Sequence, residues 1–195
     1  MIWFIAGING AGKSTLASNP YVRRELGGYV INPDEVARLI AFNARIEYRL
    51  ANLAAAEITE GEVFDADAVS DKPLAIETVL SSDKFLPVLE IAESRAIEIG
   101  LVFVALKNVE MSLNRIRTRV LAGLHDVPED RVRQRWPRTL ANLKAWAPRV
   151  DKLWVFSNYD ADRAPVLIAR KSSKFERIEI LDRLEAPEAI AQLET

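Results

Sequence analysis

The stretch GINGAGKST, residues 7–15, is the feature that most constrains the fold of this chain. It fits the pattern G-x-x-x-x-G-K-[S/T] in full, with a short apolar run before it and a helical pattern after it. Glycines in such a loop let main-chain N–H groups surround a phosphate, and the helix N-terminus adds partial positive charge. The stretch therefore predicts a strand, a phosphate-binding loop and a helix in an α/β protein.

The same loop predicts a nucleoside triphosphate and a metal ion as ligands. Lys13 is expected to reach the β- and γ-phosphates, which would make it catalytic, and the Ser14 hydroxyl is expected to ligate magnesium. The predicted cofactors are ATP and Mg²⁺. The residues expected to bind the nucleotide are Gly7, Asn9, Gly10, Ala11, Gly12, Lys13, Ser14 and Thr15.

Size and composition describe an ordinary globule. The 195 residues are enough for one domain with a buried core, so we expect a single domain over residues 1–195. The absence of cysteine excludes disulfides and thiolate chemistry, and the net charge of −2 argues against nucleic acid as a partner. No apolar run approaches the roughly 18 residues of a membrane span, so we expect a cytoplasmic location.

Short apolar runs alternate with longer helical patterns, which indicates a parallel sheet. We expect a P-loop NTPase fold with a mainly parallel five-stranded sheet flanked by helices. The predicted strands cover residues 2–6, 28–32, 74–79, 101–106 and 153–158. The predicted helices cover 13–20, a segment starting at 33, 44–57, 86–99 and, with one interruption, 111–146. The tail adds two candidate strands, PVLIAR and FERIEIL, and a short helix without an assigned place.

Asp34 follows the second predicted strand, at the edge of the sheet where ligands bind. A carboxylate there could accept the proton of a substrate hydroxyl as it attacks the γ-phosphorus. The alternative is purely structural, because an acid in the first turn of a helix is stabilised by the helix dipole. Asn32 as N-cap and Glu35 at the third helical position already provide such a helix start.

Glu77 ends the third apolar run, and Thr78 follows it. An acid at this place resembles a degenerate Walker B residue, which holds Mg²⁺ through water or orients a substrate hydroxyl. We therefore expect Glu77, Thr78 and Asp34 at the substrate site. The alternative for Glu77 is a solvated strand end.

The segment at residues 111–146 is rich in arginine and predicts a helical lid. Its arginines at helical spacing are Arg115 with Arg119, and Arg131 with Arg135 and Arg138. The opposite apolar stripes are Leu113, Ile116 and Val120, and Val132, Trp136, Leu140 and Leu143. Guanidinium groups suit the charge that develops on a transferred phosphoryl group. The alternative is that most of them are solvated and paired with acids such as Glu129 and Asp130.

Other residues give weaker signals. The single histidine, His125, lies in the turn between the lid helices and is expected to be structural. Trp136 and Trp154 fall at core positions, and no histidine–carboxylate cluster suggests zinc.

Four strings in order resemble the zeta-toxin-like P-loop kinases: GINGAGKST, INPDEVARL, IETVLSSDKFLPVLEIA and RTRVLAGLHDVPEDRVRQRWPRTLANL. The similarity covers roughly residues 1–160, and GLHDVPEDRVRQRW is its specific part. It implies a kinase that transfers the γ-phosphoryl group of ATP to the 3′-hydroxyl of a UDP-N-acetylamino sugar. It also implies an antitoxin protein that covers the nucleotide cleft.

The resemblance assigns roles to individual residues. It implies that Asp34 is the catalytic base and Glu77 a substrate-site acid, beside the lysine and serine of the loop. It also implies that Arg119 and Arg135 are catalytic lid arginines, with Arg131 and Arg133 close to them in the pattern.

Two other functions compete with this interpretation. One is a P-loop ATPase that acts as a switch or regulator, and the other is a 5′-polynucleotide kinase. The base, the acid and the lid arginines together favour phosphoryl transfer in a closed site over hydrolysis. The acidic segment between Glu60 and Pro73 is longer than expected for the family, so the identity of the acceptor stays open.

Overall fold

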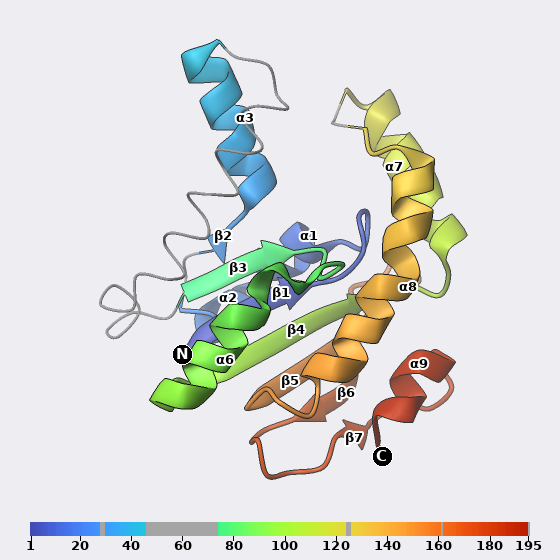
Figure 1. Ribbon diagram of the computed structural model, residues 1–195. Coiled ribbons are helices and arrows are strands. Elements are labelled where there is room, and N and C mark those ends of the chain that lie inside the picture. Colours follow the sequence, from blue (N-terminus) through green and yellow to red (C-terminus); the bar gives the residue numbers. More distant parts are fainter. Residues whose placement is uncertain (28–29, 46–73, 124–125, 161, 195) are drawn as a thin grey trace.

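A computed structural model describes residues 1–27, 30–45, 74–123, 126–160 and 162–194. Its centre is a seven-stranded sheet in the order β2-β3-β1-β4-β5-β6-β7 (Figure 1). The strands are β1 (Ile2–Ala6), β2 (Val30–Ile31), β3 (Leu74–Thr78), β4 (Ile99–Ala105), β5 (Lys152–Ser157), β6 (Val166–Lys171) and β7 (Glu179–Ile180). Strands β1 to β5 pair in parallel, as predicted.

The predicted number of five strands is too small. The two candidate strands of the tail join the same sheet as β6 and β7, and both pair antiparallel. A short connection after β5 permits this geometry, whereas a parallel strand would need a long crossover. Of the segment FERIEIL, only Glu179–Ile180 is a strand.

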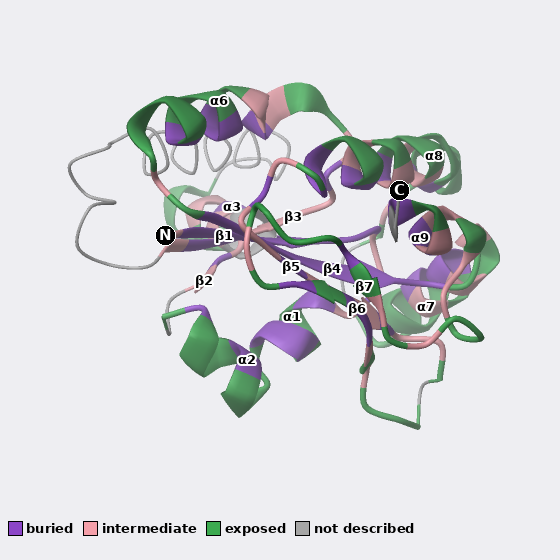
Figure 2. Ribbon diagram, turned by 90° about the horizontal axis from the view of Figure 1, so that it is seen from below, coloured by how far each residue is buried: buried purple, intermediate pink, exposed green. Residues whose placement is uncertain are grey.

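Helices cover both faces of the sheet (Figure 2). The helices are α1 (Lys13–Ala17), α2 (Pro20–Glu25), α3 (Pro33–Ala44), α6 (Leu86–Arg95), α7 (Val109–Leu121), α8 (Glu129–Trp146) and α9 (Glu188–Ala191). Alternation along β1 sends Ile2 and Phe4 into a core with α6, α8 and α9, and Trp3 and Ile5 into a second core with α1, α2 and α7. The phosphate loop thus starts from a strand that is buried on both faces.

Two helix boundaries differ from the prediction. The helix after the phosphate loop ends at Ala17, and Asn19 caps a separate helix by accepting a hydrogen bond of 3.0 Å from the Tyr21 N–H. Helix α6 ends at Arg95 because Ala96 adopts a left-handed φ of 55°, so it does not reach residue 99. Helix α3 begins as predicted at residue 33, while the predicted helix 44–57 and the acidic segment 60–73 lie almost wholly outside the described residues.

The lid segment forms α7 and α8, which pack against each other (Figure 1). We call α7 and α8 the lid helices. Of their predicted apolar stripes, Leu113, Ile116, Val132 and Leu143 are buried and Trp136 and Leu140 are half-buried. Val120 is 37% exposed, so the first stripe is shorter than predicted. Within the described ranges, no helix is apolar and long enough to cross a membrane.

Helix α8 is anchored to the carboxyl end of β3. The Thr139 hydroxyl donates a hydrogen bond of 3.1 Å to the Val79 carbonyl, and the Asn142 amide donates one of 3.1 Å to the Leu80 carbonyl. Leu80 is buried and adopts a positive φ of 57°, a conformation that surrounding contacts must maintain. The second half of α8 is therefore held at the end of the strand that pairs with β1, the strand before the phosphate loop.

Candidate nucleotide-binding site

The phosphate loop is pressed against the ends of two strands, and this needs glycine at two positions. Gly7 has a φ of +144°, and a Cβ there would lie 2.6 Å from the Val104 carbonyl oxygen. Gly12 has a φ of +94°, and a Cβ there would lie 2.4 Å from Nδ2 of Asn158. A side chain at Gly7 would push the loop away from the main chain of β4, and one at Gly12 would displace either the loop or the Asn158 amide.

Asn158 fixes this loop from the end of β5. Its amide donates a hydrogen bond of 2.7 Å to the carbonyl of Ala11. The sequence analysis did not single out Asn158 as a site residue. The available signal was its position directly after a parallel strand, at the edge of the sheet where ligands bind.

Lys13 is 7% exposed and lies inside the loop. Its ammonium donates hydrogen bonds to the carbonyls of Gly7 (2.9 Å) and Ile8 (3.2 Å). A buried ammonium needs such acceptors, and the loop itself supplies them. The same Nζ atom lies 3.8 Å from Oε1 of Glu77.

The carboxylate of Glu77 connects three segments. Its Oε2 atom accepts hydrogen bonds from the Ser14 hydroxyl (2.9 Å) and from the Asn32 amide (3.0 Å). The Glu77 side chain is only 13% exposed, so it is not a solvated strand end. Asn32 was predicted as a helix N-cap, and its contact with the site became visible only in the structure.

Ser14 and Glu77 offer oxygen donors that suit a magnesium ion. Among the described residues, no group of three or more histidine, cysteine, aspartate or glutamate side chains could hold a metal.

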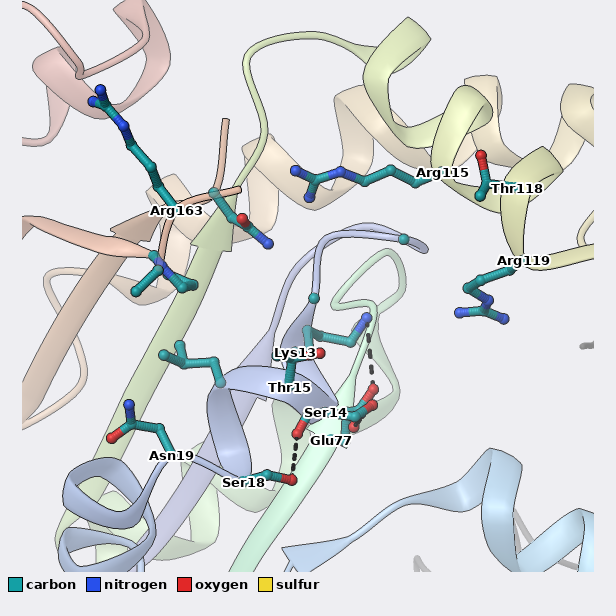
Figure 3. Close-up of a pocket in the computed structure, with 16 residues that line it drawn as sticks. Lys13, Ser14, Thr15, Ser18, Asn19, Glu77, Arg115, Thr118, Arg119 and Arg163 are labelled. Carbon is teal, nitrogen blue, oxygen red and sulfur yellow. Dashed lines mark hydrogen bonds and ion pairs between the residues drawn. The ribbon is translucent and has the colours of Figure 1, made fainter. Parts of the chain in front are cut away.

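A cavity of about 710 Å³ lies between the phosphate loop and α7 (Figure 3). Of the predicted site residues, those that line it are Gly10, Gly12, Lys13, Ser14, Thr15, Glu77 and Arg119. Arg115, Asn158 and residues 163–165 also line it. Figure 3 shows Arg115 extending toward the side where Arg163 lies, while Arg119 turns toward the side of Glu77.

Arg115 lies half-buried in this wall. Burial lowers the pKa of its guanidinium, which still stays charged at neutral pH. An anion in the cavity would compensate for the water that this cation has lost. Helical spacing predicted that Arg115 shares a helix face with Arg119, but the resemblance to the kinase family assigned no role to Arg115.

Two further predicted residues, Arg135 and Thr78, are described but do not line this cavity. Arg135 donates a hydrogen bond of 3.1 Å to Oδ1 of Asn9 at the tip of the loop. The Thr78 hydroxyl accepts one of 3.1 Å from the Leu80 N–H. Gly7 and Ala11 complete the loop. Asp34 belongs to the first turn of α3, and its side chain, like His125, lies outside the described part of the structure.

Ion pairs occupy two of the lid arginines. Glu129 pairs with Arg117 at 3.0 Å and with Arg133 at 2.7 Å, and Glu110 also pairs with Arg133, at 2.6 Å. The pairs Glu129–Arg117 and Glu110–Arg133 join α7 to α8 on an exposed face. Arg117 and Arg133 are thus exposed and paired with acids. Of the arginines that the prediction named, Arg131 and Arg138 are exposed, whereas Arg115 and Arg119 line the cavity.

Comparison with known sequences gives one informative relative. No protein-family model matches the chain. An uncharacterized protein of Haemophilus influenzae (strain ATCC 51907 / DSM 11121 / KW20 / Rd) is 30% identical over 133 residues, which cover 68% of this chain and 90% of that protein. The chain belongs to the same family as this Haemophilus protein.

Comparison with solved structures identifies the fold. A chain of the AvrRxo1-ORF1:AvrRxo1-ORF2 complex matches with a TM-score of 0.69 at 13% identity, and the match covers 94% of this chain and 61% of that one. A chain of the same complex solved with ATP matches with a TM-score of 0.64 at 12% identity, over 93% and 60% of the two chains. A chain of the PezAT toxin–antitoxin system of Streptococcus pneumoniae matches at 0.65 and 17% identity, over 99% and 77%.

This protein has the fold of the zeta-toxin-like P-loop kinases. It spans about three fifths of the AvrRxo1 chains that it matches, 61% and 60% of their length.

Proposed function

We propose that the protein is an ATP-dependent kinase that transfers the γ-phosphoryl group to a hydroxyl of a small molecule. The observation that carries this proposal is the meeting of Lys13, Ser14 and Glu77 at the mouth of the phosphate loop. Phosphoryl transfer requires a cation that binds the phosphates, a hydroxyl that ligates the metal ion and an acid on the neighbouring strand. The similarity of fold to a complex solved with ATP supports the choice of nucleotide.

The residues of the loop would change partners when nucleotide binds. Lys13 would exchange the carbonyls of Gly7 and Ile8 for oxygens of the β- and γ-phosphates. Ser14 and Glu77 would hold Mg²⁺, directly or through water, and the ion would neutralise charge on the phosphates. The hydrogen bond between Ser14 and Glu77 already brings both groups to one place.

The two arginines of α7 that line the cavity would act on different parts of the nucleotide. Arg119 turns toward Glu77, so we assign it to the charge that develops on the transferred phosphoryl group (Figure 3). Arg115 extends the other way, so we assign it to the part of the nucleotide nearer Arg163. We retain Arg135 as the lid arginine at the loop tip.

Asp34 is proposed as the base that accepts the proton of the attacking hydroxyl. Its neighbour Asn32 contacts Glu77, and this places the start of α3 beside the site. A base there would lie on the acceptor side of the γ-phosphate, with Thr78 at the end of the adjacent strand. This arrangement supports transfer to a hydroxyl over hydrolysis.

We propose a UDP-N-acetylamino sugar as the acceptor and an antitoxin protein as a partner. The support is the resemblance of four sequence strings to zeta toxins and the similarity of fold to a chain of a toxin–antitoxin system. Transfer to the 3′-hydroxyl would produce a phosphosugar nucleotide that is heavier by one phosphoryl group.

Mass spectrometry of UDP-N-acetylglucosamine after incubation with the protein and Mg-ATP tests the acceptor. The expected product gains one phosphoryl group with the wild-type protein and does not form with the Asp34→Asn variant. Unmodified sugar beside consumed ATP would contradict the acceptor and leave the nucleotide site in place.

A further inference from the structure

Asn9, at the tip of the phosphate loop, is contacted by both lid helices. From α7, the hydroxyl of Ser112 donates a hydrogen bond of 2.7 Å to the Asn9 main-chain carbonyl. From α8, the guanidinium of Arg135 donates one of 3.1 Å to the Asn9 side-chain oxygen. Two residues more than 100 positions away in the chain thus meet on one residue of the loop.

These two hydrogen bonds act on different atoms and can be separated. Ser112 is fully buried and holds the main chain of Asn9 whatever side chain the residue carries. The next residue, Gly10, also lies against this helix, because a Cβ there would be 3.1 Å from the Ser112 carbonyl oxygen. A change of the Asn9 side chain therefore leaves the path of the loop in place and removes only the contact with Arg135.

Arg135 reaches Asn9 from a fixed part of α8. One turn further along this helix, Thr139 binds the Val79 carbonyl at 3.1 Å. Toward the start of the helix, Arg133 and Glu129 join α8 to α7 through ion pairs with Glu110 and Arg117. The base of the arginine side chain is thus held from both directions along the helix, and Asn9 contacts its charged end.

The hydrogen bond from Arg135 to Asn9 is chemically compatible with binding of a phosphate by the same arginine. A carboxylate, such as the Glu129 group that pairs with Arg117 and Arg133, offsets the charge of its arginine. The amide oxygen of Asn9 is neutral, so this hydrogen bond orients the guanidinium without itself adding a negative charge beside it. A guanidinium fork has five N–H donors, so an arginine oriented by a neutral acceptor can also donate a charge-assisted hydrogen bond to a phosphate oxygen.

We propose that Asn9 is a positioning residue that holds Arg135 at the loop tip, where the arginine meets the γ-phosphate of a bound triphosphate. The pair Asn9–Arg135 would make the site prefer ATP over ADP and bring the lid helices into contact with the reacting phosphate. This inference rests on the proposed nucleotide site, and it adds a residue that determines which phosphorylation state of the nucleotide is bound.

Calorimetric titration with Mg-ADP and with the magnesium complex of β,γ-imido ATP tests this inference without any knowledge of the acceptor. The wild-type protein is expected to bind the triphosphate more tightly than ADP. Asn9→Ala should reduce this preference about tenfold, the effect of losing one hydrogen bond to a charged group. Arg135→Ala should reduce it at least as much, and the double variant no further than Arg135→Ala.

Affinity for Mg-ADP in the same titrations serves as the control for folding. Lys144→Ala, which removes an exposed cation from the same helix, should keep the wild-type preference. If Asn9→Ala fails to bind ADP, Asn9→Leu, which keeps the size of the side chain and lacks the acceptor, takes its place.

The outcomes separate this inference from the proposed function. A wild-type preference in the Asn9 variant, or losses that simply add in the double variant, would overturn the positioning role while nucleotide binding stands. A wild-type protein that binds neither nucleotide would overturn the proposed function and this inference together.

Discussion

The hydroxyl of Ser14 donates a hydrogen bond of 2.9 Å to the carboxylate of Glu77, a residue 63 positions further along the chain. The two residues come from the segments that follow β1 and end β3, which are paired in parallel. Their contact brings the expected magnesium residue and the strand-end acid to one point. It also provides the most direct way to test the site by substitution.

Glu77→Gln should reduce the dependence of ATP affinity on magnesium. Loss of the charge removes a favourable partner for Mg²⁺ and an unfavourable one for free phosphates. We expect magnesium to raise ATP affinity about tenfold less in this variant than in the wild type, with metal-free ATP bound more tightly. Calorimetric titrations with and without Mg²⁺ measure both effects.

The matched control for this variant is Glu98→Gln, which changes an exposed acid just before β4. It should leave both affinities unchanged. An equal magnesium effect in Glu77→Gln and in the wild type would remove Glu77 from the metal site.

Gly12→Ala should both destabilise the fold and abolish nucleotide binding. The new Cβ would lie 2.4 Å from the Asn158 amide, at a φ of +94°. Gly123→Ala in the turn after α7 is a matched control, because its φ is +79° and nothing lies within 4 Å of the new atom. We expect about 1 kcal/mol of destabilisation for Gly123→Ala from the backbone conformation alone, and a clearly larger loss for Gly12→Ala.

Thermal unfolding and ATP binding measure these two glycine variants. Equal stability of the two would mean that the loop can move away from Asn158. In that case the close contact between the loop and the end of β5 would not constrain the site.

Much of this site follows from the sequence because its parts are local. The spacing of Gly7, Gly12 and Lys13 sets the loop, and the apolar runs before and after it set the parallel strands that place Glu77 beside Ser14. Helical spacing also places Arg115 and Arg119 on one face.

The contacts made by asparagine side chains could not be predicted in the same way. Asn9, Asn32 and Asn158 carry neutral amides, whose partners depend on segments distant in the chain. Helical spacing likewise gives the shared face of Arg115 and Arg119 but not the opposite directions of their side chains (Figure 3). The antiparallel strands β6 and β7 were hard to place because β7 has only two residues and both strands lie toward the edge of the sheet.

Asp34→Asn should lower turnover by about 10²- to 10⁴-fold if this residue is the general base. Affinity for Mg-ATP should survive, because the loop residues that bind the phosphates are unchanged. Initial rates of product formation and a calorimetric titration check the two parts. Unchanged turnover would leave Asp34 with only its structural role in the first turn of α3.

Acid should weaken the attachment of α6 to the end of α8. Arg149 donates hydrogen bonds to Glu93 at 2.8 and 3.2 Å and lowers the pKa of this carboxyl below its usual value. Because the pKa is lower in the folded state, the pair stabilises the fold above the unfolded pKa of 4.5, and this contribution is lost as the pH falls below it. With both side chains one third exposed, the contribution should not exceed about 1 kcal/mol.

Unfolding curves between pH 3 and pH 7 for the wild type and Glu93→Gln measure this contribution. The difference in stability between the two proteins should shrink as the pH falls below 4.5. A difference that stays constant with pH would show that the charge of Glu93 does not contribute.

The central claim is that the γ-phosphoryl group goes to a hydroxyl and not to water. Phosphorus NMR of the protein with Mg-ATP and a bacterial small-molecule extract follows this group directly, with Lys13→Ala as the inactive control. We predict a new phosphomonoester resonance that grows as ATP becomes ADP in the wild type and is absent in the variant. Conversion of ATP to ADP and inorganic phosphate alone, at the same rate with and without extract, would contradict the account and indicate a hydrolytic switch.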